Sequence, residues 1–356
     1  MKNKLVDLNN HLFAQLEKLS DDDLTGDALK EEVVSPFFIR QIAVPFDGEE
    51  LEAYAKSCDR LNALYIRLAN KHKRIKETEG DGFFAYLQML VSQEDDTAVA
   101  YHLEILNRRR IVCMAKSRIL CTVDLLHQLR ERSRVIVFCE RVAQAEQAAK
   151  ELRKHFPFQV SVYHSQLHRT QKQRELSAFR QGDARILVAC RALDEGMDVP
   201  DADVAVILSG RIVERQRIQR LGRILRKNDP EKVAALYFLY VKGSSEDGCF
   251  LPVGEKHTQI SMHYFPEEHA FSCPFYENAA LEILDMLRKQ DASPQQIKEA
   301  RRCLMEGMLR PDWQRESRSK PKITTQQEEN YWKCMQWVFH RVQRIQEAEH
   351  GLRDSL

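Results

Sequence analysis

The pattern of hydrophobic and polar positions changes twice along the chain. Residues 49–75 carry apolar side chains at helical spacing, and residues 109–129 do so again. A spacing of three to four residues predicts amphipathic helices. Gly80 and Gly82 interrupt the pattern between these segments and predict a break. We therefore expect a helical connector region over residues 1–115.

Short and nearly continuous apolar runs replace the helical pattern in the middle of the chain. They occupy residues 135–138, 186–189, 204–208 and 236–241. Helical patterns, such as the one from Val142 to Leu152, alternate with these runs. Such an alternation is typical of parallel strands that helices bury on both faces. The predicted fold class is α/β, with a parallel sheet over residues 116–242 and ligand sites beyond the carboxyl ends of its strands.

The last part, residues 243–356, is expected to be mostly helical. Ser293 and Pro294 predict the start of one helix, and Gly307 predicts its end. A second helix carries an apolar stripe made by Trp332, Met335, Val338, Phe339, Val342 and Ile345. Such a stripe favours packing against the body of the protein, and a partner helix is the alternative.

Composition narrows the class of protein. Apolar residues make up 43% of the chain and charged residues 30%, which is typical of a folded soluble protein. The sequence has neither an apolar run of about 18 residues nor a secretory signal, so we expect no membrane span. Nine cysteines without a CxxC pair favour a reducing, cytoplasmic setting. The net charge of +1 leaves nucleic acid open as a partner, because the distribution of charge matters more than its sum.

The most specific run of residues is Gln219 to Arg226. Arg223 and Arg226 are three positions apart, so on a helix they point roughly the same way. Gly222 beside them allows another surface to approach closely. Two guanidiniums on one face can clamp a polyphosphate, and an inserted arginine neutralises charge that develops on a γ-phosphate. A solvated basic helix face is the alternative interpretation.

A second run, residues 193–200, follows the predicted strand at residues 186–189. This order places it at the carboxyl edge of the sheet, where ligand sites form. Gly196 permits a tight turn, and Asp198 can accept hydrogen bonds from a ribose hydroxyl. A simple acidic turn is the alternative.

Four segments in order carry a resemblance to a known family. They are residues 135–140, His164–Ser165, residues 189–200 and residues 219–226. Together they resemble motifs IV, IVa, V and VI in the C-terminal RecA-like lobe of superfamily 2 helicases, a group that includes the DEAD/DEAH and repair-type enzymes. The resemblance covers residues 130–242 closely. The helical stretch from about residue 35 is also similar to the segment that precedes motif IV in repair-type members.

This resemblance implies roles at a nucleotide site. Arg226 is implied as the arginine finger, and Arg223 as a second contact to the γ-phosphate. Gln219 would couple nucleotide and nucleic acid. Gly196 and Asp198 would face the nucleotide across a cleft. The implied cofactors are ATP and Mg²⁺.

The resemblance also implies a nucleic-acid surface, on which Ser165, Cys190 and Arg191 would lie. Many relatives carry Thr or Ser at the position of Cys190. A thiol is a weak donor, so this departure puts a direct phosphate contact from that side chain in doubt. The likeness to repair-type members favours DNA over RNA as the bound strand.

The other half of an ATPase site is missing from the sequence. It contains neither a Gly-x-x-x-x-Gly-Lys-Ser/Thr loop for phosphates nor an Asp-Glu-x-His or Asp-Glu-x-Asp box for Mg²⁺. We therefore expect the chain to be inactive without an N-terminal RecA-like lobe, supplied in cis or in trans. Two alternatives stay open: a non-catalytic nucleic-acid-binding or adaptor module, and a motor subunit of a restriction or defence system.

Cysteine and histidine residues gather between residues 249 and 273. They are Cys249, His257, His263, His269 and Cys273. These residue types bind structural zinc, but their spacing matches no standard zinc finger. Aromatic neighbours such as Tyr264 and Phe271 favour a packed hairpin, so no metal is predicted here and zinc is the alternative.

Overall fold

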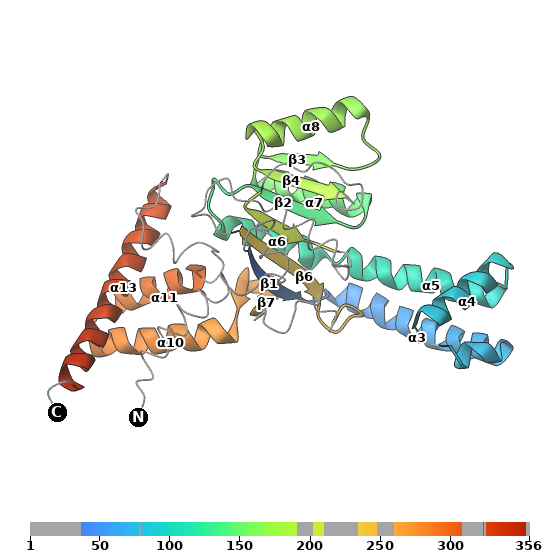
Figure 1. Cartoon of the computed structure of the whole chain (residues 1–356), viewed down its shortest axis with the longest axis horizontal. Helices are drawn as coiled ribbons and strands as arrows, with labels where there is room; N and C mark the ends of the chain where they lie inside the picture. Colours follow the sequence, from blue (N-terminus) through green and yellow to red (C-terminus); the bar gives the residue numbers. More distant parts are fainter. Residues whose placement is uncertain are drawn as a thin grey trace, which may run out of the picture.

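The computed structural model describes residues 37–78, 80–190, 202–209, 234–247, 260–307, 323 and 325–353. An eight-stranded sheet at its centre has the order β3-β4-β2-β5-β6-β1-β7-β8 (Figure 1). The strands are β1 (Phe37–Val44), β2 (Val135–Cys139), β3 (Val160–Tyr163), β4 (Ile186–Cys190), β5 (Val204–Ile207), β6 (Ala234–Val241), β7 (Ile260–Phe265) and β8 (Ala270–Ser272). Every pair of neighbours is parallel except β7 and β8. The predicted α/β class is confirmed.

The four predicted strands of the middle part are confirmed as β2, β4, β5 and β6. Every residue of β2, β4 and β5 is buried, because helices or neighbouring elements cover both faces. That burial is why these strands appear in the sequence as continuous apolar runs.

Strand β1 is not predicted by the sequence. It includes Arg40 and Gln41, which interrupt its apolar run, yet both are buried. The Arg40 guanidinium donates a hydrogen bond of 3.0 Å to the hydroxyl of Tyr237, its register partner on β6. A buried charged group is tolerated when it is hydrogen-bonded, and here the partner lies 197 positions away in the chain. The short strand β3 was also missed.

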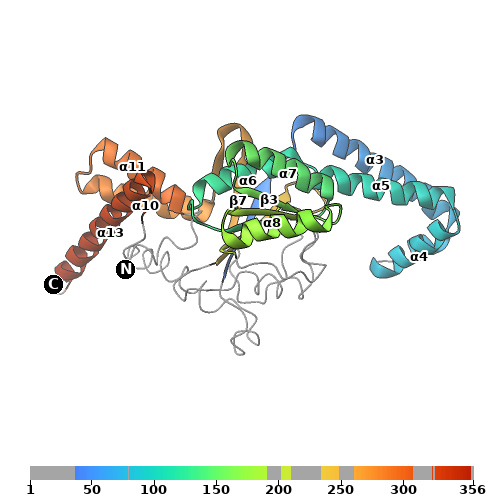
Figure 2. The ribbon, with the colours of Figure 1, turned by 90° about the horizontal axis from the view of Figure 1, so that it is seen from above.

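Two helical groups flank the sheet directly. Helix α6 (Lys116–Gln128) and helix α7 (Val142–His155) lie on one face, and α8 (Arg169–Gln181) lies on the other (Figure 2). The connections β2–α7–β3 and β3–α8–β4 cross the sheet in opposite directions. Because parallel crossovers are right-handed, these two helices must lie on opposite faces. The prediction of helices on both faces is therefore confirmed.

The first part of the chain forms a group of helices that extends away from the sheet. They are α3 (Gly48–Lys71), α4 (Gly80–Ser92) and α5 (Asp96–Cys113), with the 3₁₀ helix η1 (Lys73–Lys76) after α3. Asp47 and Glu50 form a capping box at the start of α3. The pattern over residues 109–129 proves to be two helices, since the chain breaks between α5 and α6 at Met114 and Ala115.

The C-terminal helices are α10 (Pro274–Lys289), α11 (Pro294–Gly307) and α13 (Gln326–Arg353). Ser293 caps α11 through Gln296, and Gly307 is its last residue, so both predicted ends are confirmed. In the apolar stripe of α13, Trp332, Met335, Val338 and Val342 are buried in the main hydrophobic cluster. The stripe therefore packs within this chain.

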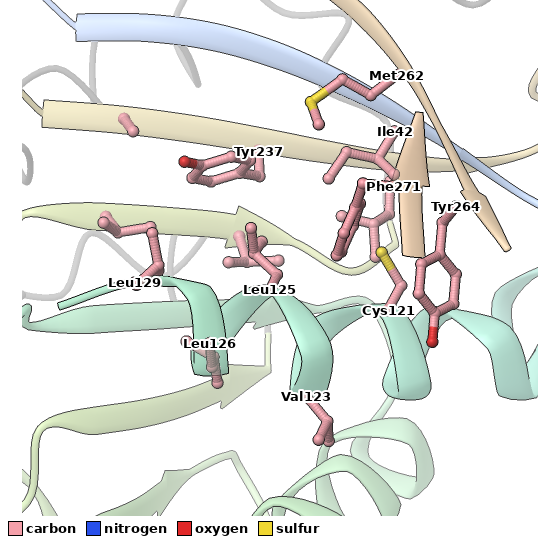
Figure 3. Packing of buried hydrophobic residues seen from close by; sticks show 14 of the residues in the cluster. Ile42, Cys121, Val123, Leu125, Leu126, Leu129, Tyr237, Met262, Tyr264 and Phe271 are labelled. Atoms are coloured by element: carbon pink, nitrogen blue, oxygen red, sulfur yellow. The ribbon is translucent and has the colours of Figure 1, made fainter. Parts of the chain in front are cut away.

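The hairpin of β7 and β8, with the 3₁₀ helix η2 (Pro266–Glu268) between them, packs on α6. Tyr264 and Phe271 are buried beside Leu125 and Ile42 in the same cluster (Figure 3). The predicted packed hairpin is confirmed. Cys249 and His257 lie outside the described residues, and His269 Nδ1 lies 2.9 Å from the Asp124 carboxylate.

The two outer helical groups leave the sheet at opposite edges. Helix α3 follows the carboxyl end of β1, whereas α10 follows β8, which runs antiparallel to its neighbour. Figure 1 shows α3–α5 on one side of the sheet and α10–α13 on the other. The sheet takes strands from all three regions expected from the sequence. The boundaries proposed at 115/116 and 242/243 stay predictions.

Candidate functional site

The strands that carry the sequence motifs end at one edge of the sheet. Tyr163 of β3 pairs with Ala189 of β4, and Cys139 of β2 pairs with Cys190 of β4. Because these strands are parallel and in register, the segments that follow them emerge side by side. This carboxyl edge is where open α/β sheets bind ligands.

Two of the predicted site residues lie on this edge. Ser165 follows β3 and is exposed, so its hydroxyl is open to solvent. Cys190 ends β4 and is only 3% exposed. Its thiol lies in the hydrophobic cluster together with Cys139. Burial raises the pKa of the Cys139 thiol well above its ordinary value, and the neighbouring thiols of Cys190 and Cys113 add to the shift. Both strand ends therefore carry a buried thiol.

The other predicted site residues fall outside the described part of the chain. They are Arg191, Gly196, Asp198, Gln219, Arg223 and Arg226. Their roles stay predictions. The segment that contains the first three begins directly after β4, and the segment with the last three joins Ser209, beyond β5, to β6.

A polar network ties the ends of β2 and β5 to the end of helix α5. The Ser209 hydroxyl donates a hydrogen bond to Gln144 Oε1, and Glu140 N donates to Ser209 Oγ at 3.3 Å. The amide of Gln144 donates to the carbonyl of Cys113. The thiol of Cys113 lies 3.4 Å from Ser209 Oγ. Buried polar groups that are satisfied in this way hold one geometry, so the network makes the edge rigid.

A buried arginine clamps the neighbouring strand ends. Arg118 on α6 has no exposed surface, and its guanidinium donates to the carbonyls of Val112, Leu208 and Leu239. It also forms an ion pair with Glu246. The three carbonyls belong to the end of α5 and the ends of β5 and β6. One side chain therefore sets the relative positions of three elements at the carboxyl edge.

Cations line the same edge. Arg109 of α5 forms an ion pair with Glu140, directly after β2. Arg141 follows Glu140, and Arg169 begins α8 just beyond β3. Lys172 Nζ lies 5.6 Å from the centre of the Tyr163 ring, at the end of β3. We call Arg109, Arg141, Arg169 and Lys172 the basic edge. Positive charge along a strand-end edge suits contacts to phosphates.

The histidine of the His164–Ser165 segment has a supporting role in the fold. His164 follows β3, is 3% exposed, and its Nε2 lies 2.5 Å from Glu146 Oε1 on α7. This pair connects helix α7 to the turn after β3, and Ser165 lies in that turn. The supporting residues Arg118, Gln144 and Ser209 were not found from the sequence, because their partners are distant in the chain or are backbone atoms.

None of the helices in the described part of the chain combines the length and apolar character that crossing a lipid bilayer requires.

Comparisons with known proteins find sequences and structures to which this chain is similar. Residues 115–228 match the family model described as the helicase conserved C-terminal domain. The DNA 3'-5' translocase XPB2 of Sulfurisphaera tokodaii is 28% identical over 233 residues, which cover 60% of this chain and 49% of that protein. The ATP-dependent RNA helicase DBP8 of Lodderomyces elongisporus is 33% identical over 96 residues, or 27% of this chain and 21% of that protein.

Among solved structures, the C-terminal domain of the Sulfolobus solfataricus SWI2/SNF2 ATPase is 12% identical. The similarity covers 59% of this chain and 82% of that one, with a TM-score of 0.39. The chain spans about half the length of the first of the two curated relatives and about a fifth of the second.

Proposed function

We propose that this chain supplies the C-terminal lobe of an ATP-dependent helicase or translocase. The premise is that residues 115–228 form a helicase C-terminal domain. The observation that carries the proposal is the agreement between this family match and the sheet. The segments after β2, β3 and β4 emerge at one carboxyl edge, as the order of the motifs requires. The lobe would act together with an N-terminal RecA-like lobe, in cis or in trans, that binds the β-phosphate and Mg²⁺.

In this proposal the arginines act on ATP held between the lobes. Arg226 is the arginine finger and Arg223 contacts the γ-phosphate, where their charge offsets the negative charge that develops during phosphoryl transfer. Gln219 couples this movement to nucleic acid, and Gly196 and Asp198 face the nucleotide. The placement of β4 and β5 beside β2 supports these roles, because both segments start from the carboxyl edge.

The nucleic-acid strand would contact the basic edge and Ser165. The contacts are to phosphates, so binding should depend little on sequence and strongly on salt. Cys190 would contribute through its backbone, since its side chain is buried. Arg191, the next residue, would supply a further cation. We favour DNA over RNA because the match to the DNA translocase covers 60% of the chain and the match to the RNA helicase covers 27%.

The test is reconstitution of ATP hydrolysis. The full chain is mixed with a recombinant N-terminal helicase lobe that carries a phosphate loop and an acidic box, and DNA-stimulated ATPase is measured. Arg226→Ala should lower the rate by roughly 10³ to 10⁵. Arg60→Ala, at an exposed position on α3, is the matched control and should leave the rate unchanged.

Three outcomes bear on different parts of the proposal. Full hydrolysis by the Arg226→Ala variant would refute the arginine-finger role. Substantial hydrolysis by the chain alone would refute the need for a second lobe. DNA binding without hydrolysis, with any N-terminal lobe from a related helicase, would favour a non-catalytic adaptor over a motor subunit.

A further inference from the structure

A cluster of metal-ligand side chains lies where α11 packs against α13, at the opposite end of the molecule from α3–α5 (Figure 1). It consists of Glu299, Cys303 and Cys334, whose ligand atoms all lie within 4.8 Å of one another. It is the one such group within the described ranges of the chain. The site is separate from the carboxyl edge and from the Cys/His-rich stretch discussed above.

Helix geometry brings the three groups together. Glu299 and Cys303 are four positions apart on α11, so they lie on the same face of that helix. Cys334 comes from α13, between the buried residues Trp332 and Met335. Because this face of α13 packs on α11, Cys334 meets the other two across the helix contact.

The two thiols are close enough to interact directly. Cys303 is fully buried, and Cys334 is partly exposed. The sulfur atoms of the two side chains lie within 4.8 Å of each other, and the Cys303 thiol donates a hydrogen bond of 3.7 Å to Glu299 Oε1. Three ligand atoms are thus gathered by side chains whose helices are already packed, so little further ordering is needed on binding.

An arginine beside the cluster donates hydrogen bonds to two of its ligand side chains. Arg302 donates to Glu299 Oε1 at 2.6 Å and to Cys303 Sγ at 3.5 Å. Hydrogen bonds of this kind orient ligating groups and tune a metal site. Two thiolates and a carboxylate carry three negative charges, of which one divalent cation would offset two. The Arg302 guanidinium, which also forms an ion pair of 2.9 Å with Glu306, would offset part of the remainder.

We propose that Glu299, Cys303 and Cys334 bind a thiophilic divalent cation of the Zn²⁺ class, with water as the fourth ligand. Two sulfur ligands select Zn²⁺ over hard cations such as Mg²⁺ and Ca²⁺, which prefer oxygen. The partial exposure of Cys334 leaves access for the water. The bound ion would join α11 to α13 and so stabilise the C-terminal helical unit.

Cobalt provides the direct test, because thiolate sulfur bound to Co²⁺ gives a charge-transfer band in the near ultraviolet. The full chain is purified free of metal in a non-thiol reductant and titrated with Co²⁺ and then with Zn²⁺. We expect one Co²⁺ per chain, a sulfur-to-cobalt band, displacement of cobalt by Zn²⁺, and a higher melting temperature with Zn²⁺.

Three variants separate the ligands from the fold. Cys334→Ser should lower the band intensity per bound ion to about half and bind Co²⁺ roughly 100-fold more weakly or worse, since it removes one of the two thiolate ligands. Glu299→Gln, at a position whose side chain is 41% exposed, should weaken binding while the band intensity per bound ion stays the same, because both thiols remain. Cys58→Ser, a partly exposed cysteine on α3, is the matched control and should bind as the wild type does.

The possible outcomes distinguish metal binding at this site from its absence. No sulfur-to-cobalt band in the reduced wild type would overturn the proposal, and so would a band of full strength in Cys334→Ser. A disulfide between Cys303 and Cys334, with no cobalt binding after its reduction, would overturn it in favour of a redox pair. A band whose intensity per bound ion falls only in Cys334→Ser, together with a weakened affinity in Glu299→Gln, would support it.

Discussion

Replacing the buried arginine of α6 tests whether one side chain holds the carboxyl edge together. In Arg118→Leu, the carbonyls of Val112, Leu208 and Leu239 each lose a donor, and the Glu246 carboxylate loses its ion pair. Leucine fills much of the space but cannot donate a hydrogen bond. The edge would therefore keep its packing and lose the polar connections that Arg118 makes.

The size of the effect follows from burial. Arg118 is fully buried, whereas the Glu246 side chain is 23% exposed, so water can replace only part of what the carboxylate loses. Removing one partner of a buried ion pair costs about 3–5 kcal/mol. Each of the three carbonyls also loses one donor, which adds to this cost, although the carbonyl of Val112 still accepts from Ala115 N. We expect the free energy of unfolding to fall by at least about 3–5 kcal/mol.

Urea unfolding followed by far-ultraviolet circular dichroism measures this loss. Arg118→Lys should recover part of it, because an ammonium keeps the charge opposite Glu246 but cannot reach three carbonyls in a planar fork. Lys56→Ala, which breaks an exposed ion pair with Glu52, is the control and should leave the free energy of unfolding nearly unchanged, because water screens this pair. A loss below about 1 kcal/mol for Arg118→Leu would refute the clamp.

Three further predictions concern separate parts of the molecule. The ammonium of Lys71 and a backbone N–H lower the pKa of the Asp95 carboxyl, so its stabilisation is complete above about pH 4 and is lost as the pH falls further. Melting temperatures of Asp95→Asn should then fall less steeply below about pH 4 than those of the wild type, and an equal slope would contradict this. Tyr264→Phe removes a hydrogen bond to Asp124 and should cost about 1.5 kcal/mol in urea unfolding; an unchanged midpoint would show that the bond contributes nothing. If the proposed strand contact is right, Arg109→Ala should reduce the slope of log affinity for duplex DNA against log salt by about 0.9, and an unchanged slope would remove this residue from the phosphate contacts.

Much of the fold could be predicted because its strands and helices carry local patterns. Strands β2, β4, β5 and β6 are buried on both faces, so their sequences are apolar throughout. Helix α11 begins and ends where Ser293, Pro294 and Gly307 indicate. The position of residues 193–200 directly after a predicted strand also predicted that this segment lies at the carboxyl edge of the sheet. All of these features depend on neighbours in the sequence.

Other features depended on residues that are far apart. Strand β1 joins the sheet between β6 and β7 although Arg40 interrupts its apolar pattern, because Tyr237 on β6 satisfies the guanidinium. Cys190 was expected to line the strand-binding surface, and the structure shows that its thiol is buried.

The sequence by itself therefore determined the class of fold, most central strands and the edge at which ligands are expected. Only the tertiary structure decided which polar groups support that edge and which thiols meet between α11 and α13. The physical reason is that burial and hydrogen bonding act between whatever atoms become neighbours in space. Arg118 and Leu239, for example, lie 121 positions apart in the chain and 2.9 Å apart in the fold.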